Sequence, residues 1–318
     1  MRWLFLLWFC LIHGSALSQA WPTRPIRLVV GFAPGGAADF VARALEQPLS
    51  RALGQPLVID YRPGAGSSIA AEHVARSAPD GYTVLIASAS SILVNPLLTK
   101  GSFQPMKELA AVTRVSTSPL LLAVNPALNV ANLKELVLYA KQNPGKLNYS
   151  SSGNGSMPHM AAVLFVRSAG VEMVHVPYKG GGPSVQSLLA GDTHLSFATP
   201  PSVLPLVQAG RLRALAVTSR ERTPVVPGVP GMAEAGLPDY EISLWYGFFL
   251  PAGTPAATIK RLFEDTRQVL ALPEISTTLA RQITEASGSK SPEDFTAFLE
   301  REAILWSRLV RESGAKAE

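Results

Sequence analysis

Glycine-rich loops with small polar side chains occur at several points of this 318-residue chain where an apolar segment ends. Residues 35–36, 64–66 and 153–156 are loops of this kind, and each precedes a segment with helical periodicity. The unpaired amides and partial positive charge of a helix N-terminus attract an anion, and glycine lets the backbone approach it closely. Each loop alone also fits an ordinary strand-to-helix turn. Several of them together indicate a small-anion site, with Ser88 and Ser90 as neutral donors.

Strands and helices in alternation would bring these loops to one edge of a sheet. Apolar strands are predicted at 26–32, 57–60 and 82–87, and a helical segment follows each of the first two. Pro48 should kink or shorten the first of these helices. In an open parallel sheet, ligands bind at the loops that follow the carboxyl ends of the strands.

The same pattern restarts in the second part of the chain, where Asn132 is suited to cap a helix that has Glu135 at its third position. Further strands are predicted at 120–124, 147–149, 171–176, 195–198, 212–217 and 244–250. We therefore predict an α/β fold with two lobes, each a helix-covered, mainly parallel sheet. Residues 21–121 and 244–318 would form the first lobe, and residues 122–243 the second.

The first twenty residues have the three-part layout of a secretory signal peptide. Arg2 precedes an apolar run, and Ser18 and Ala20 are small residues at the positions that determine cleavage. The run of about ten apolar residues is too short for a membrane span, which takes ~20. We predict an exported protein that is cleaved near Ala20. Cleavage removes Cys10, the one cysteine, and so excludes disulfides, catalytic thiols and zinc-thiolate sites from the mature chain.

The charge of the chain is mildly basic and scattered. There are 28 Lys and Arg against 23 Asp and Glu, and the loss of Arg2 leaves 27 against 23, a formal charge of +4. Without a run of basic residues nucleic-acid binding is not indicated, and the bias favours anionic small molecules. The four histidines after residue 20 lack metal-ligand spacing, so no metal is predicted. The loop 31–36 lacks the nucleotide-binding motifs, and no cofactor is predicted.

A secreted hydrolase is the alternative from a different functional class. Serines are plentiful, but no G-x-S-x-G nucleophile elbow is present. Asn154-Gly155-Ser156 does not replace it, and the spacing supports no Ser-His-Asp trio. We therefore predict a binding protein without catalytic residues. A receptor that signals to a membrane sensor is a further alternative, which the sequence does not separate from transport.

Motifs along the chain resemble those of the substrate-binding proteins of tripartite tricarboxylate transporters, the Bug (Bordetella uptake gene) type. The matching runs are WPTRPIR (21–27), GFAPGGAAD (31–39), RPGAG (62–66), APDGY (78–82), LNY (147–149) with SGNG (152–155), HVPYKG (175–180), LRALAVT (212–218), AEAGLP (233–238) and PAGTP (251–255). The resemblance implies a monomeric periplasmic Venus-flytrap protein that closes on a small organic carboxylate. It also implies delivery of that ligand to a separate membrane transporter.

The resemblance also implies which residues hold the ligand carboxylate. The positions that match are, in the first lobe, Phe32, Ala33, Gly35, Gly36, Asp39, Ser88 and Ser90, and in the second, Ser152, Asn154, Ser156, His159, Tyr178, Ala198 and Thr199. In this family type, backbone amides and ordered waters make part of the contact. Ligand identity therefore leaves little trace in the side chains.

Some of these positions have a second interpretation. Many relatives carry an aspartate where this chain has Ala198, and its loss argues against a ligand with an amino group, because a buried ammonium needs an opposite charge. Asp39 lies in a first helical turn, where a carboxylate also stabilises the helix. Phe32 fits either a pocket wall or the core, and His159 either a ligand contact or a packed residue. Lys179 could pair with the ligand or stay solvated.

Overall fold

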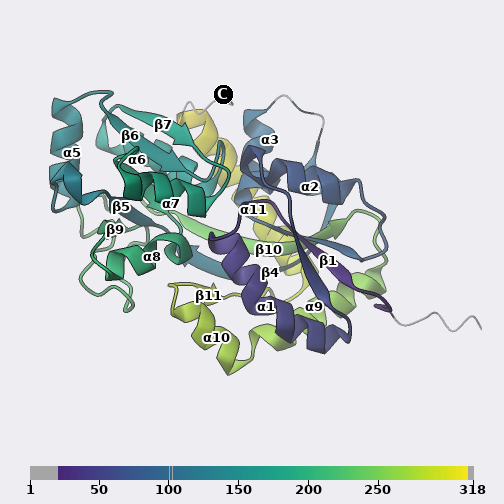
Figure 1. The fold of residues 1–318 in the computed structure, drawn as a ribbon. Coiled ribbons are helices and arrows are strands. Elements are labelled where there is room, and N and C mark those ends of the chain that lie inside the picture. Colours follow the sequence, from purple (N-terminus) through teal and green to yellow (C-terminus); the bar gives the residue numbers. More distant parts are fainter. Residues whose placement is uncertain (1–20, 100, 102, 314–318) are drawn as a thin grey trace, which may run out of the picture.

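The computed structural model describes residues 21–99, 101 and 103–313, so the predicted signal peptide lies outside the described residues. Two β-sheets, each covered by helices, form two lobes that lie side by side (Figure 1). The two-lobed α/β fold predicted from the sequence is therefore confirmed.

The first lobe is built on a six-stranded sheet. Its strands lie in the order β11 (Glu285–Ala286), β4 (Leu109–Pro119), β10 (Ser243–Pro251), β3 (Thr83–Ala87), β1 (Ile26–Val30) and β2 (Leu57–Tyr61). β1 is parallel to β2 and β3, as the strand–helix alternation predicts, whereas β10 runs antiparallel to β3 and β4. The helices of this lobe are α1 (Ala37–Leu53), α2 (Ser68–Ala75), α3 (Asn95–Leu98), α4 (Pro105–Glu108), α9 (Ala256–Leu270), α10 (Pro273–Ala280) and α11 (Pro292–Ser313). Two shorter helices belong to it as well, the 3-10 helix η1 (Ala65–Ser67) and the π-helix η2 (Ser90–Val94).

The second lobe is built on a five-stranded sheet. Its strands lie in the order β7 (Met173–Pro177), β6 (Leu147–Ser151), β8 (Leu195–Ala198), β5 (Leu121–Val124) and β9 (Arg213–Val217). β6 is parallel to β7 and β8, and β5 is antiparallel to β8 and β9. Around the sheet lie α5 (Leu133–Gln142), α6 (Met157–Ala169), α7 (Gly181–Ala190), α8 (Pro200–Gln208) and the turn η3 (Pro126–Leu128). Both sheets are thus mixed, because the strands that enter from the other lobe join them antiparallel.

The chain passes between the lobes at two points that are hydrogen-bonded to each other. Leu120 alone separates β4 from β5, and residues 218–242 connect β9 to β10. The hydroxyl of Thr218 accepts a hydrogen bond from the Leu120 amide at 2.7 Å and donates one to the Ile242 carbonyl at 2.7 Å. The two crossing segments therefore form a paired connection. The residue boundaries predicted for the lobes stay a prediction.

Two local predictions have opposite outcomes. The helix predicted to be kinked or shortened at Pro48 is not shortened there, because α1 continues to Leu53. Val41, Leu45 and Leu49 are fully buried on one face of α1, and this packing offsets the hydrogen bond that proline removes. The cap at Asn132 is confirmed, since its Oδ1 accepts from the Glu135 amide at 2.9 Å.

β4, the longest strand described, was not predicted from the sequence. Its Thr, Ser and Arg residues hide the apolar pattern of a strand. In the fold two of these polar residues, Thr113 and Arg114, find partners far along the chain. The Thr113 hydroxyl accepts from the Ser289 amide at 3.1 Å, and the Arg114 guanidinium donates to the Ser287 carbonyl at 3.2 Å. Tertiary contacts therefore stabilise a strand that its own sequence does not indicate.

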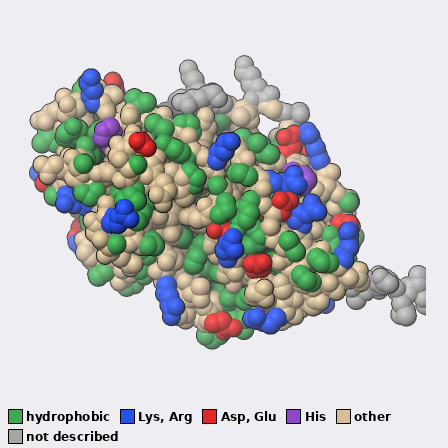
Figure 2. Space-filling model, viewed as in Figure 1, with side chains coloured by type: hydrophobic (Ala, Val, Ile, Leu, Met, Phe, Trp, Pro, Cys, Tyr) green, Lys and Arg blue, Asp and Glu red, His purple; other side chains and the backbone are tan. Residues whose placement is uncertain are grey.

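The described surface agrees with the scattered charge of the sequence. On the face shown in Figure 2, Lys and Arg side chains are interspersed with Asp and Glu. Among the helices of the described residues, none has the length and apolar character needed to cross a membrane. The same part of the chain contains no cluster of His, Cys, Asp or Glu suited to a metal ion.

Candidate functional site

A small buried cavity lies where loops of both lobes meet. It is lined by Phe32, Gly36, Ala37, Ala38, Ser88, Ser90, Ser152, Met157, Pro158, Gly181, Thr199, Leu244 and Tyr246. Its volume of about 10 Å³ is enough for about one water molecule. The lobes are therefore in contact around the cavity.

Helix N-termini from both lobes surround this cavity. Ala37 and Ala38 begin α1, Pro158 lies in the first turn of α6, Gly181 begins α7, and Thr199 caps α8. Each N-terminus contributes unpaired amides and a partial positive charge. Among the described residues that line the cavity, none carries a charged side chain. The cavity is thus suited to an anion that is held without a cationic side chain.

Two serine hydroxyls on the first-lobe side have no hydrogen-bond partner within the described chain. Ser88 follows β3 and Ser90 begins η2, and each is 1% exposed. A buried hydroxyl without a partner costs about 1–3 kcal/mol. Both hydroxyls line the cavity, where a bound acceptor would satisfy them. Ser152 and Thr199 add hydroxyl groups from the second lobe.

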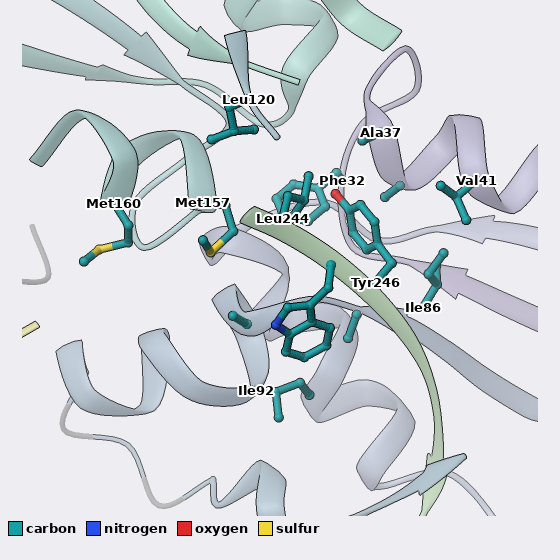
Figure 3. Packing of buried hydrophobic residues seen from close by; sticks show 14 of the residues in the cluster. Phe32, Ala37, Val41, Ile86, Ile92, Leu120, Met157, Met160, Leu244 and Tyr246 are labelled. Atoms are coloured by element: carbon teal, nitrogen blue, oxygen red, sulfur yellow. The ribbon is translucent and has the colours of Figure 1, made fainter. Parts of the chain in front are cut away.

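Apolar side chains complete the cavity wall. Figure 3 shows Leu244 and Tyr246 extending from β10 towards Phe32, with Met157 on the side of α6. Leu244 and Tyr246 point to the same face because they are two residues apart on a strand. Burial raises the pKa of the Tyr246 phenol, so it is a neutral group in the wall. Such a wall would surround the uncharged body of a ligand.

The structure brings six of the predicted site residues to the cavity and leaves eight outside its lining. Those that line it are Phe32, Gly36, Ser88, Ser90, Ser152 and Thr199. Those outside are Ala33, Gly35, Asp39, Asn154, Ser156, His159, Tyr178 and Ala198. The sequence did not indicate seven further residues that line the cavity, Ala37, Ala38, Met157, Pro158, Gly181, Leu244 and Tyr246; Leu244 and Tyr246 lie in the uniformly apolar run of β10, which does not distinguish them from their neighbours.

Asp39 has its carboxylate turned to its own lobe. It accepts hydrogen bonds from the Gly35 amide at 2.9 Å, from the Arg43 guanidinium at 2.7 Å and from the Tyr61 hydroxyl. Burial, with this hydrogen bond to Asp39 as the next cause, raises the pKa of Tyr61 to about 12. These contacts correspond to the second interpretation of Asp39, in which it stabilises the start of α1.

Several second-lobe positions also have partners within the protein. The Ser156 hydroxyl caps α6 by accepting from the His159 amide at 3.4 Å, and Ser156 is fully buried. The Tyr178 hydroxyl donates to Ser187 at 2.6 Å, and Ala198 packs in the apolar cluster between β8, β5 and α8. Asn154 differs, because its side-chain oxygen is buried without a partner in the described residues. Ligand contact by the residues outside the cavity stays a prediction.

Glycines let the two lobes approach each other closely at positions near the residues that line the cavity. The Ala33 amide of the first lobe donates to the Lys179 carbonyl of the second at 2.9 Å. A Cβ on Gly180 would lie 2.9 Å from the Ala33 nitrogen, and one on Gly155 would lie 1.7 Å from Asn95 Oδ1. Contacts this short leave no room for a side chain, so the observed contact between the lobes requires glycine at these positions.

Comparison with known proteins shows the family of the chain. Residues 41–315 match the family described as tripartite tricarboxylate transporter family receptor, TctC. The chain belongs to this family. It is 35% identical over 307 residues to the protein BugT of Bordetella pertussis, covering 96% of this chain and 94% of that protein. The resemblance to the Bug type inferred from the sequence is therefore confirmed, and the chain is a solute-binding protein of the periplasmic class.

Solved structures of similar proteins share the fold. The periplasmic binding protein BugD is 29% identical, with a TM-score of 0.89 over 94% of this chain and 100% of that chain. An R. palustris protein, Rpa4515, solved with adipate, is 35% identical, with a TM-score of 0.89 over 93% of this chain and 99% of that chain.

Proposed function

We propose that this protein binds a small organic carboxylate between its lobes, at the site of this cavity, which must widen to admit the ligand because in the described arrangement it holds about one water. The observation that carries the proposal is the meeting of helix N-termini with the unpartnered hydroxyls of Ser88 and Ser90 in a cavity without charged side chains. Buried amides and hydroxyls stabilise a carboxylate without a counter-ion, since hydrogen bonds to a charged group are the strong ones. The similar R. palustris protein solved with adipate supports a carboxylate ligand.

Calorimetry against aliphatic and aromatic carboxylates, with adipate among them, tests the proposal. A hydrogen bond to a charged group contributes about 1.5–3 kcal/mol, so Ser88→Ala and Ser90→Ala should each raise Kd about 10- to 150-fold. Ser91→Ala is the matched control, because Ser91 is equally buried and unpartnered but does not line the cavity. Absence of binding across the panel, or an equal loss in the Ser91 variant, would contradict the proposal.

The same proposal extends to closure and delivery. The ligand would bridge the lobes, draw them together around itself and present a closed shape to a membrane transporter of the tripartite tricarboxylate type. Membership of the receptor family supports this role. Deletion of the gene should abolish uptake of the identified acid, and the wild-type gene, but not the Ser88→Ala variant, should restore it. Normal uptake with loss of a transcriptional response would favour a sensor instead.

Export to the periplasm is part of the proposal. Residues 1–20 carry the features of a signal peptide, and the family contains periplasmic binding proteins. The mature protein isolated from the periplasmic fraction should begin at or near Trp21. A mature protein that retains residues 1–20 would contradict the proposed cleavage.

The hydrolase alternative receives no support from the geometry. Its nucleophile would be Ser156, which is fully buried and whose oxygen caps α6. The family to which the chain belongs binds substrates rather than converting them.

A further inference from the structure

Three aromatic rings stack beside the second-lobe loop at 151–156. His159 of α6 lies on His175 of β7 with ring centroids 4.0 Å apart and an interplanar angle of 7°. Tyr149 of β6 continues the stack at 4.9 Å from His175. His159 is 6% exposed and Tyr149 is 4% exposed, whereas His175 between them is half-buried, so the stack extends from the interior of the lobe towards its surface.

Each imidazole is hydrogen-bonded to the loop itself. The Gly155 amide donates to His159 Nδ1 at 3.0 Å, and Ser151 Oγ lies 2.6 Å from His175 Nε2. Ser151 Oγ in turn accepts from the Gly153 amide at 3.1 Å. The two glycines of the loop are therefore both connected to the stacked imidazoles. Gly155 bonds directly to His159, and Gly153 is connected to His175 through Ser151.

The 151–156 loop is one of the parts of the second lobe that reach the site. Ser152 lines the cavity and stands between Ser151 and Gly153. Gly155 faces Asn95 of the first lobe, where there is no room for a Cβ. Gly153 and Gly155 both have positive φ angles, 121° and 67°, so the loop has a backbone shape that needs support from outside.

We propose that His159 and His175 form a platform that positions the 151–156 loop for ligand binding and lobe contact. They are positioning residues, because they act through Ser151 and Gly155 and do not line the cavity. The proposal deepens the proposed function, on which its ligand readout rests.

The platform requires neutral imidazoles. His159 Nδ1 accepts a hydrogen bond, so it carries no proton in this arrangement. Burial lowers the pKa of His159 to about 4, and burial followed by the charge of a protonated His159 lowers that of His175 to about 3. His159 also lies in the first turn of α6, where the helix dipole disfavours a positive charge. At neutral pH both rings are therefore in the state that the loop needs.

Amide hydrogen exchange of the peptide covering residues 150–157, in the full chain, tests the platform without any ligand. His159→Phe keeps a flat ring but removes the acceptor, and we expect exchange in this peptide to accelerate about two- to tenfold. His159→Asn places an oxygen near the position of Nδ1, and it should restore exchange to within about twofold of wild type. Ser151→Ala, a small truncation, should accelerate exchange by a similar factor.

His194→Phe is the matched control. Its Nδ1 also accepts a backbone hydrogen bond, from the Asn148 amide at 2.9 Å, but at the other end of β6. It should leave exchange at 150–157 unchanged. Equal acceleration in this control, or wild-type exchange in both His159→Phe and Ser151→Ala, would overturn the platform.

Calorimetry adds the ligand readout. For the tightest-binding acid of the panel, Kd should rise in His159→Phe and recover in His159→Asn. Unchanged affinity in His159→Phe would also overturn the positioning role. A wild-type protein that binds no acid of the panel contradicts the proposed function, whereas the exchange results still decide whether the platform exists.

Discussion

The substitution Gly155→Ala should weaken ligand binding by an amount that can be measured separately from its effect on folding stability. The new Cβ would lie 1.7 Å from Asn95 Oδ1 and 2.8 Å from its Cγ, both in the first lobe. Asn95 is 5% exposed, and its amide nitrogen donates to the Ala65 carbonyl at 2.9 Å and to the Gly66 carbonyl at 3.2 Å. The side chain therefore cannot move aside without losing these bonds, and the penalty applies only where the lobes touch.

The size of the effect follows from these contacts. Loss of two hydrogen bonds of about 0.5–1.5 kcal/mol each destabilises the closed form by about 1–3 kcal/mol, which raises Kd about 5- to 150-fold. Alanine at a positive φ costs a further ~1–2 kcal/mol of folding stability. Gly145→Ala isolates this second cost, because Gly145 has φ 69° against 67° for Gly155, and a Cβ there meets no atom within 4 Å.

Calorimetry and thermal unfolding together measure both effects. We expect the free energy of unfolding without ligand to fall by a similar amount in the two variants, and Kd to rise only in Gly155→Ala. Small-angle scattering with saturating ligand should show a less compact Gly155→Ala protein. Equal Kd values in the two variants would refute the reasoning, because they would show that contact at Gly155 is not part of ligand capture.

Three further predictions concern stability. Asp39→Ala removes three hydrogen bonds at the start of α1 and should lower the free energy of unfolding by about 1–2 kcal/mol. Arg43→Met removes two hydrogen bonds, to Asp39 and to the Tyr61 hydroxyl, but both come from an exposed side chain, so it should lower the free energy of unfolding by less than about 1 kcal/mol; equal losses in denaturant titrations would contradict this. Thr218→Val leaves the Leu120 amide and the Ile242 carbonyl unpaired, which should cost about 2–5 kcal/mol by the same titration, and a loss under 1 kcal/mol would refute the paired connection. The pKa of His159 is lowered from 6.5 to about 4, so between these pH values the unfolded chain binds more protons than the folded one. The contribution of the neutral His159 to the free energy of unfolding is therefore fully present above pH 6.5, and it should be lost as the pH drops towards 4, a fall on the order of 3 kcal/mol. Denaturant titrations at several pH values should show a shallower slope in His159→Phe.

Much of the fold was predictable because its signals are local. The strands β1, β3 and β8 are short apolar runs, and the Asn132 cap depends on residues three positions apart. β4 was missed because it carries polar residues among its apolar ones, and two of them, Thr113 and Arg114, are bonded to residues 287–289, about 175 positions away. No local pattern contains that information.

The sequence by itself determined that glycine-rich loops precede helices in both lobes, and hence that an anion is the ligand to expect. Only the tertiary structure decided which residues of those loops reach the cavity. Ser90 faces it, whereas Ser156 caps a helix, and Asp39 holds its own helix start. A short polar side chain near a helix N-terminus has the same chemistry in either role. The direction in which it points depends on what packs against it, and that is set by residues distant in the sequence.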